Sequence, residues 1–146
     1  SEGSEVTDLP VPGMAISGLR ALAGSIAHAV LGEPSERLSL IALTGTNGKT
    51  SCSQWIARAH PRRCAIIGTL GAGFPGALTE TGFTTPQATT LARCLAEFVE
   101  AGGDACALEA SSIGIAEGRM NGAHVDIAAL SVSAASSSNT GIGTLL

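Results

Sequence analysis

The chain has 146 residues, of which 45% are hydrophobic and 14% are charged, with a formal net charge of −4. This length and composition predict a folded domain with a hydrophobic core and exclude an intrinsically disordered chain. The acidic balance, in which Arg62-Arg63 is the densest basic spot, excludes non-specific binding of nucleic acid.

The N-terminal part of the sequence predicts a linker and one helix. Residues 1–13 are polar, contain two prolines and are typical of a linker or frayed end. Apolar residues then recur at helical spacing and predict an amphipathic helix over 15–31. They are Ile16, Leu19, Leu22, Ile26 and Val30. The turn residues Gly32-Glu33-Pro34 stop this helix before the next apolar run.

Strands and helices alternate from residue 38 onward. The predicted strands are 38–43, 63–68, 105–108 with Glu109 as the terminal residue, and 125–130. The predicted helices are 50–60, which Pro61 ends, and one that starts with Thr85 as N-cap and Pro86 as first residue and closes at Gly102-Gly103. A glycine-rich loop is predicted over 71–76. This alternation predicts an α/β fold, a mostly parallel sheet with helices on both faces.

The composition of the last 16 residues, the cysteines and the lengths of the apolar runs give three further predictions. Residues 131–146 carry no charge and five serines, and are interpreted as a low-complexity tail. The four cysteines lack zinc-ligand spacing and are interpreted as small buried residues in a reducing cytoplasm. No apolar run approaches the ~20 residues that cross a bilayer, and the acidic N-terminus is unlike a signal peptide.

The only lysine, Lys49, lies in the run Thr44-Gly45-Thr46-Asn47-Gly48-Lys49-Thr50, between a predicted strand and a predicted helix. Only Gly48-Lys49-Thr50 matches the common phosphate-loop signature, because Leu43 stands where its first glycine is expected. The chemistry still fits a nucleotide. Glycines let backbone N–H groups curl around phosphate oxygens, the lysine contacts the outer phosphates and the threonine hydroxyl holds magnesium.

Three later features are candidate partners of this loop. Glu109 ends a strand at the edge where parallel sheets assemble ligand sites, and its carboxylate could reach magnesium between phosphates. Ser111-Ser112 follows it, and Arg119 could make bidentate contacts with an anion. The alternative for each charged residue is an ordinary solvated side chain. Trp55 is interpreted as a packing residue, and the three histidines as ordinary surface or core residues.

These motifs together resemble the Mur ligases, which add amino acids to the peptidoglycan precursor. The run from Thr44 to Thr50 is similar to their ATP loop, Thr84-Thr85-Pro86 to their substrate-binding threonine pair, and Glu109-Ala110-Ser111-Ser112 with Arg119 to their Glu-x-Ser-Ser segment and downstream arginine. The resemblance covers about 15–130. Order and spacing most resemble the members that add the third amino acid, often diaminopimelate.

The resemblance implies an ATP-dependent ligase that forms an amide bond through an acyl phosphate. Its substrates would be UDP-N-acetylmuramoyl-L-Ala-D-Glu and an amino acid, diaminopimelate or lysine. Lys49 would be catalytic, Thr50 and Glu109 would bind Mg²⁺, and Thr84, Thr85, Ser111 and Arg119 would bind the muramoyl peptide. ATP would be bound by Gly45, Thr46, Asn47, Gly48, Lys49, Thr50 and Ser51.

The resemblance also implies a division into domains, and the sequence departs from the family's pattern at some positions. Residues 1–36 would be the end of an N-terminal UDP-substrate domain with a linker helix, 37–130 the first half of a P-loop NTPase-like central domain, and 131–146 an atypical tail. Ile113 and Phe83 stand where the family often has histidine and asparagine, and no second lysine is present. We therefore expect this chain alone not to ligate. The alternatives are a non-catalytic ATP- or phosphate-binding module and a cyanophycin- or folylpolyglutamate-type ligase.

Overall fold

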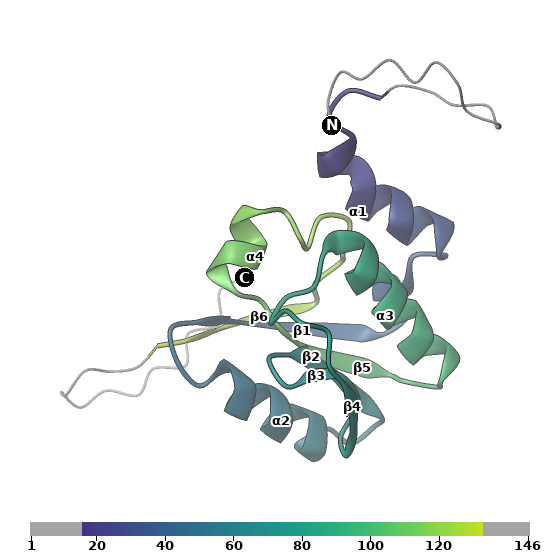
Figure 1. The fold of residues 1–146 in the computed structure, drawn as a ribbon. Coiled ribbons are helices and arrows are strands. Elements are labelled where there is room, and N and C mark those ends of the chain that lie inside the picture. Colours follow the sequence, from purple (N-terminus) through teal and green to yellow (C-terminus); the bar gives the residue numbers. More distant parts are fainter. Residues whose placement is uncertain (1–15, 133–146) are drawn as a thin grey trace.

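The computed structural model describes residues 16–132, so the predicted linker over 1–13 and the tail beyond 132 lie outside it. Figure 1 shows one sheet with helices packed on it. The helices are α1 (Leu19–Val30), a short 3₁₀ helix (Pro34–Glu36), α2 (Lys49–Ala59), α3 (Ala88–Glu100) and α4 (Ser112–Ala116). The strands are β1 (Ser39–Gly45), β2 (Cys64–Gly68), β3 (Gly71–Phe74), β4 (Ala77–Thr79), β5 (Ala105–Glu109) and β6 (Ile127–Ser131).

The six strands form one mixed sheet in the order β4-β3-β2-β5-β1-β6. The pairs β2·β5, β5·β1 and β1·β6 are parallel, which confirms the predicted mostly parallel sheet. The prediction of a loop over 71–76 is wrong, because this segment forms most of an antiparallel hairpin, β3 and β4, that extends the sheet beyond β2. Glycine weakens local strand propensity, but pairing with β2 supplies the backbone partners that the local sequence does not reveal.

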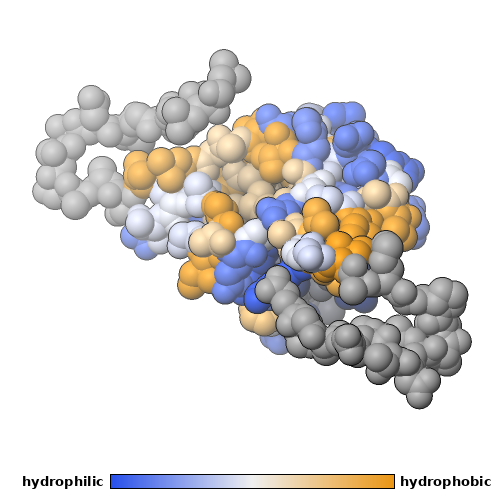
Figure 2. Space-filling model, turned by 90° about the horizontal axis from the view of Figure 1, so that it is seen from above, coloured by the Kyte–Doolittle hydropathy of each residue, from blue (hydrophilic) through white to orange (hydrophobic). Residues whose placement is uncertain are grey.

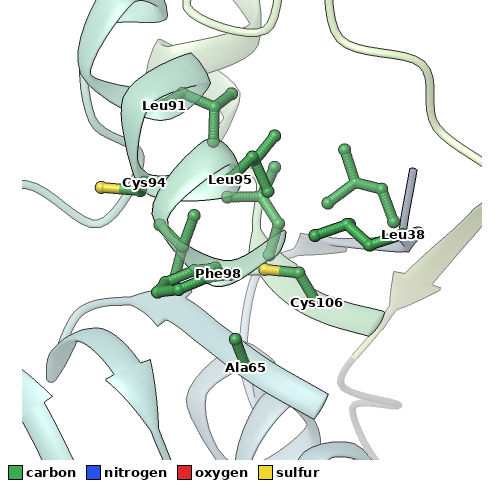
Figure 3. Packing of buried hydrophobic residues seen from close by; sticks show 10 residues of the cluster. Leu38, Ala65, Leu91, Cys94, Leu95, Phe98 and Cys106 are labelled. Atoms are coloured by element: carbon green, nitrogen blue, oxygen red, sulfur yellow. The ribbon is translucent and has the colours of Figure 1, made fainter. Parts of the chain in front are cut away.

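The core lies on both faces of the sheet because side chains alternate along each strand. On β5, Cys106 and Leu108 face α3, whereas Ala105 and Ala107 face α2. The α3 side is the larger layer, and Figure 3 shows Leu91, Leu95 and Phe98 of α3 packed over the sheet. Figure 1 shows α2 on the opposite face from α3, so the predicted helices on both faces are confirmed.

The start of α3 and the end of β6 differ from the predicted boundaries. Helix α3 begins at Ala88 with Gln87 as the preceding residue, so Thr85 is not its N-cap. The Thr85 hydroxyl instead donates to the main-chain oxygen of Glu109 at 2.7 Å, a tertiary partner that local helix signals do not include. Ser131 belongs to β6 and not to the tail, because it pairs with Gly45 at the end of β1.

The helix predicted over 15–31 forms as α1, Leu19–Val30, and so begins later than predicted, and its apolar face points outward. Leu19, Leu22, Ile26 and Val30 are exposed, whereas Gly24 and His28 on the opposite side are buried. A Cβ at Gly24 would lie 1.9 Å from the Asn121 carbonyl oxygen, so only a residue without a side chain permits this approach. Figure 2 shows orange hydrophobic patches on the face seen from above, the side on which α1 lies in Figure 1.

The exposure of Trp55 and the state of the cysteines bear on two further predictions. Trp55 is 67% exposed on α2, so its interpretation as a packing residue is wrong; its position on the helix turns it away from the sheet. The cysteines are free, and burial raises the pKa of the Cys64, Cys94 and Cys106 thiols. Within residues 16–132 no helix is long and apolar enough to cross a membrane.

Candidate functional site

The predicted phosphate loop connects the end of β1 to the start of α2. Gly45 and Gly48 have φ angles of 120° and 80°, in the left-handed region that glycine adopts without strain. Thr46, Asn47 and Gly48 are exposed, and the first N–H groups of α2 follow directly. The Lys49 ammonium group folds back over the loop and donates to the Gly45 carbonyl oxygen at 2.6 Å. The loop therefore presents backbone donors, a helix N-terminus and one ammonium group together.

The sheet places Glu109 beside this loop. Strands β1 and β5 are parallel neighbours, and their register pairs Leu43 with Glu109. Both strands therefore end at the same edge, the C-terminal edge where open parallel sheets build ligand sites. The sequence predicted a strand end at Glu109, and the strand order brings that end next to the phosphate loop although 59 residues separate Glu109 from Thr50.

The Glu109 carboxylate is 1% exposed and is held by three hydroxyl groups. Thr50 Oγ1 donates to Oε2 at 2.9 Å, Thr69 Oγ1 donates to Oε2 at 3.0 Å, and Ser53 Oγ donates to Oε1 at 3.2 Å. Gly68 lies against the same carboxylate. Within residues 16–132 this carboxylate accepts its side-chain hydrogen bonds from these three hydroxyl groups and from no arginine or lysine.

This arrangement suits a small, hard cation. Mg²⁺ in nucleotide sites takes one or two carboxylates, oxygen ligands and phosphate oxygens, not a cage of protein side chains. In the described part of the chain no three histidine, cysteine, aspartate or glutamate side chains gather into such a cage. Thr50 and Glu109 supply a hydroxyl oxygen and a carboxylate oxygen 2.9 Å apart at the phosphate loop, which fits the predicted pair of magnesium ligands.

The threonine pair divides into one interior and one outward residue. Thr85 is fully buried, and its hydroxyl donates to the Glu109 main-chain oxygen and accepts from the Ser111 N–H at 2.9 Å. Thr85 Oγ1 also lies 3.1 Å from Ser111 Oγ. Thr84 is half-buried, and its Oγ1 lies 3.1 Å from Thr69 Oγ1. Thr85 thus ties the two segments together, while Thr84 lies nearer the site's surface.

Arg119 also reaches this cluster. Its Nη1 donates to the Thr85 carbonyl oxygen at 2.8 Å, and its guanidinium carbon lies 5.0 Å from the centre of the Phe83 ring. Its Nε and Nη2 both contact Glu117 Oε2, at 2.8 and 2.6 Å. Arg119, the predicted anion-binding residue, is therefore held in place by Thr85, Phe83 and Glu117. The carboxylate that it contacts here is the Glu117 side chain.

Sequence reasoning missed four members of this site: Gly68, Thr69, Ser53 and Glu117. Thr69 follows the end of β2, so the rule that located Glu109 at a strand end would also have found it. Ser53 lies one helical turn after Thr50, on the face of α2 that meets the sheet. Nothing local in the sequence pointed to Gly68 or Glu117.

Residues 43–133 match the model of the Mur ligase middle domain. The chain belongs to the Mur ligase family. The match begins at the residue paired with Glu109 and includes the phosphate loop, the threonine pair and Arg119. The family model therefore covers every residue singled out above.

Two curated relatives and one solved structure share one name. The chain is 48% identical over 124 residues to UDP-N-acetylmuramoyl-L-alanyl-D-glutamate–2,6-diaminopimelate ligase of Acidovorax sp. strain JS42, covering 78% of this chain and 25% of that protein. It is 50% identical over 125 residues to the ligase of that name from Ralstonia nicotianae, covering 83% and 24%. A solved structure with this name superposes with a TM-score of 0.73 at 34% identity, covering 92% of this chain and 29% of that one. The chain thus spans about a quarter of the length of its curated relatives.

Proposed function

We propose that this chain carries the ATP and magnesium site, and part of the substrate site, of a ligase that joins diaminopimelate to UDP-N-acetylmuramoyl-L-Ala-D-Glu. The observation that carries the proposal is the 2.9 Å hydrogen bond between Thr50 and Glu109 at the phosphate loop. The two relatives and the solved structure named above are diaminopimelate ligases, which supports the choice of substrates. The runner-up is a non-catalytic nucleotide-binding module with the same loop.

In this proposal Gly45 to Ser51 bind the phosphates of ATP. Exposed backbone N–H groups of the loop and the N-terminus of α2 face the phosphate oxygens, and Lys49 leaves the Gly45 carbonyl to contact the outer phosphates. Thr50 and Glu109 would hold Mg²⁺, and the bound ion would neutralise part of the negative charge of the phosphates. Lys49 is the catalytic residue because it stabilises the charge that develops on the transferred phosphoryl group.

The substrate carboxylate would be phosphorylated by ATP to give an acyl phosphate and ADP, and the amine would then displace phosphate to form the amide. The chain's contribution is placement. Thr84, Ser111 and Arg119 bind the muramoyl peptide near the γ-phosphate, and Thr85 supports this role by holding Ser111. Holding the substrate carboxylate in line with the γ-phosphate lowers the entropic part of the activation free energy, because the two reacting groups no longer have to find each other.

The domain division stays part of the proposal. Residues 1–36 would end the UDP-substrate domain, and the outward apolar face of α1 is consistent with a contact to another domain. Residues 37–130 would be the first half of the central domain, since Ile127 and Leu130 of β6 are each 51% exposed at the sheet edge. A cytoplasmic location, also proposed, agrees with four free cysteines.

Nucleotide binding is the first test. Isothermal titration of the 146-residue chain with the non-hydrolysable analogue AMP-PNP should give magnesium-dependent binding. Lys49→Ala should weaken it by about tenfold or more, the loss expected for a charge-assisted contact. Arg58→Ala is the matched control, because Arg58 lies exposed near the other end of α2 and its removal changes the net charge equally. Equal weakening by both variants would contradict a specific role for Lys49.

Substrate binding separates the candidate functions. The ligase proposal requires binding of UDP-N-acetylmuramoyl-L-Ala-D-Glu in addition to AMP-PNP. Binding of the nucleotide without the muramoyl peptide would favour the nucleotide-binding module or a cyanophycin-type ligase. The chain alone is still expected not to ligate, and amide formation with radiolabelled diaminopimelate by the 146-residue chain would refute that expectation.

A further inference from the structure

Thr69 connects the buried carboxylate of the proposed metal site to the outward threonine of the proposed substrate site. Its hydroxyl donates to Glu109 Oε2 at 3.0 Å and lies 3.1 Å from Thr84 Oγ1. Thr69 itself is exposed and stands immediately after β2. The three side chains therefore form a hydrogen-bonded row from the buried Glu109 carboxylate through the exposed Thr69 to the half-buried Thr84.

The number of hydroxyl protons determines which oxygen donates and which accepts in each hydrogen bond of this row. A threonine hydroxyl has one proton and two lone pairs. The proton of Thr69 is used in the bond to Glu109, so in the contact with Thr84 the Thr69 oxygen accepts and Thr84 donates. In this state the Thr84 proton points to the Thr69 oxygen and cannot bind an oxygen of a substrate.

The carboxylate has no free lone pair on the side that faces the phosphate loop. Oε2 accepts from both Thr50 and Thr69, and a carboxylate oxygen has about two lone-pair positions. A cation that binds Oε2 must therefore displace one of these two hydroxyl protons. Thr50 is held in the first turn of α2, and its oxygen faces the same cation in the proposed function. Thr69 is outside any helix or strand and exposed, so its hydroxyl is the one that can turn away.

We propose that Thr69 is a positioning residue that couples cation binding at Glu109 to substrate binding at Thr84. When a divalent cation takes the Oε2 lone pair, the Thr69 proton turns to the Thr84 oxygen, and the Thr84 proton turns outward to a substrate oxygen. Only hydrogen bonds change, and every proton stays on its own oxygen. This inference rests on the proposed function, because it takes Glu109 as the cation ligand and Thr84 as a substrate contact.

The test measures the affinity of the 146-residue chain for UDP-N-acetylmuramoyl-L-Ala-D-Glu with and without saturating Mg²⁺ and AMP-PNP. The unsubstituted chain should bind about fivefold or more tightly with the magnesium nucleotide, the range of one hydrogen bond and of typical coupling between sites. Thr69→Val, which keeps the shape and removes the hydroxyl, should reduce this ratio to near one. Thr69→Ser should restore it. Thr79→Val is the matched control, because Thr79 is an exposed threonine on β4, two strands beyond β2.

A second measurement follows Thr84 directly. The NMR signal of its methyl group should move when magnesium and AMP-PNP are added to the unsubstituted chain and to Thr69→Ser, and should stay in place in Thr69→Val. An unchanged affinity ratio in Thr69→Val, or a ratio near one in the unsubstituted chain, overturns the coupling and leaves the proposed function intact. Failure of the unsubstituted chain to bind either ligand overturns the proposed function and the coupling with it.

Discussion

Replacing Gly68 by alanine tests whether the Glu109 carboxylate is held in one position. A Cβ at Gly68 would lie 2.1 Å from Glu109 Oε1 and 2.4 Å from its Cδ. The backbone of Gly68 is outside the left-handed region, so alanine adds no backbone strain and its effect comes from this contact. The carboxylate must retreat from 2.1 Å to ordinary contact beyond 3.4 Å, which breaks the 3.2 Å bond from Ser53.

The expected cost is about 2.5–6 kcal/mol of unfolding free energy, from overpacking at about 1–3 kcal/mol and a lost hydrogen bond to a charged group at about 1.5–3 kcal/mol. Urea unfolding measures this cost. Affinity for magnesium and AMP-PNP should fall in parallel, because the displaced carboxylate no longer faces Thr50.

A double-mutant cycle isolates the cause. Glu109→Ala removes the Oε1, Cδ and Cγ atoms that the new methyl group would meet, so Gly68→Ala should be nearly neutral in that background. The coupling between the two changes should be at least about 1 kcal/mol. An equal cost of Gly68→Ala with and without the Glu109 side chain would refute the reasoning.

Three further predictions concern Thr85 and Glu117 in the site and His28 on α1. Thr85→Val removes a fully buried hydroxyl that bonds Glu109 and Ser111, and should cost about 1–3 kcal/mol in urea unfolding, whereas Thr85→Ser should cost less. Glu117→Gln weakens the carboxylate contact that now occupies Arg119, so the Kd for the muramoyl peptide should fall; an unchanged or higher Kd would count against competition between this glutamate and the substrate. Burial lowers the pKa of His28 below its ordinary value of 6.5, so the unfolded chain binds the proton more tightly than the folded chain does. The free energy of unfolding should therefore fall as the pH drops below about 6.5. His28→Gln should make this fall smaller, as measured by urea unfolding between about pH 7 and 5.

Much of the fold could be predicted from the sequence because its signals are local. The strands β1, β2 and β5 each contain an apolar run, and helices α2 and α3 have turn residues at their ends. The hairpin of β3 and β4 could not be predicted, because its glycine-rich segments become strands only by pairing with β2. The orientation of α1 was also hidden, since periodicity shows that a helix has an apolar face but not which face meets the domain.

The candidate site shows the same division. The sequence by itself determined the phosphate loop, because a strand, two glycines, a lysine and a hydroxyl in one short run constrain each other locally. Only the tertiary structure decided which side chains complete it. Thr50, Thr69 and Glu109 meet because the sheet order sets β5 between β2 and β1, although it comes after both in sequence. Contacts across such crossovers depend on strand order, which no local pattern of residues encodes.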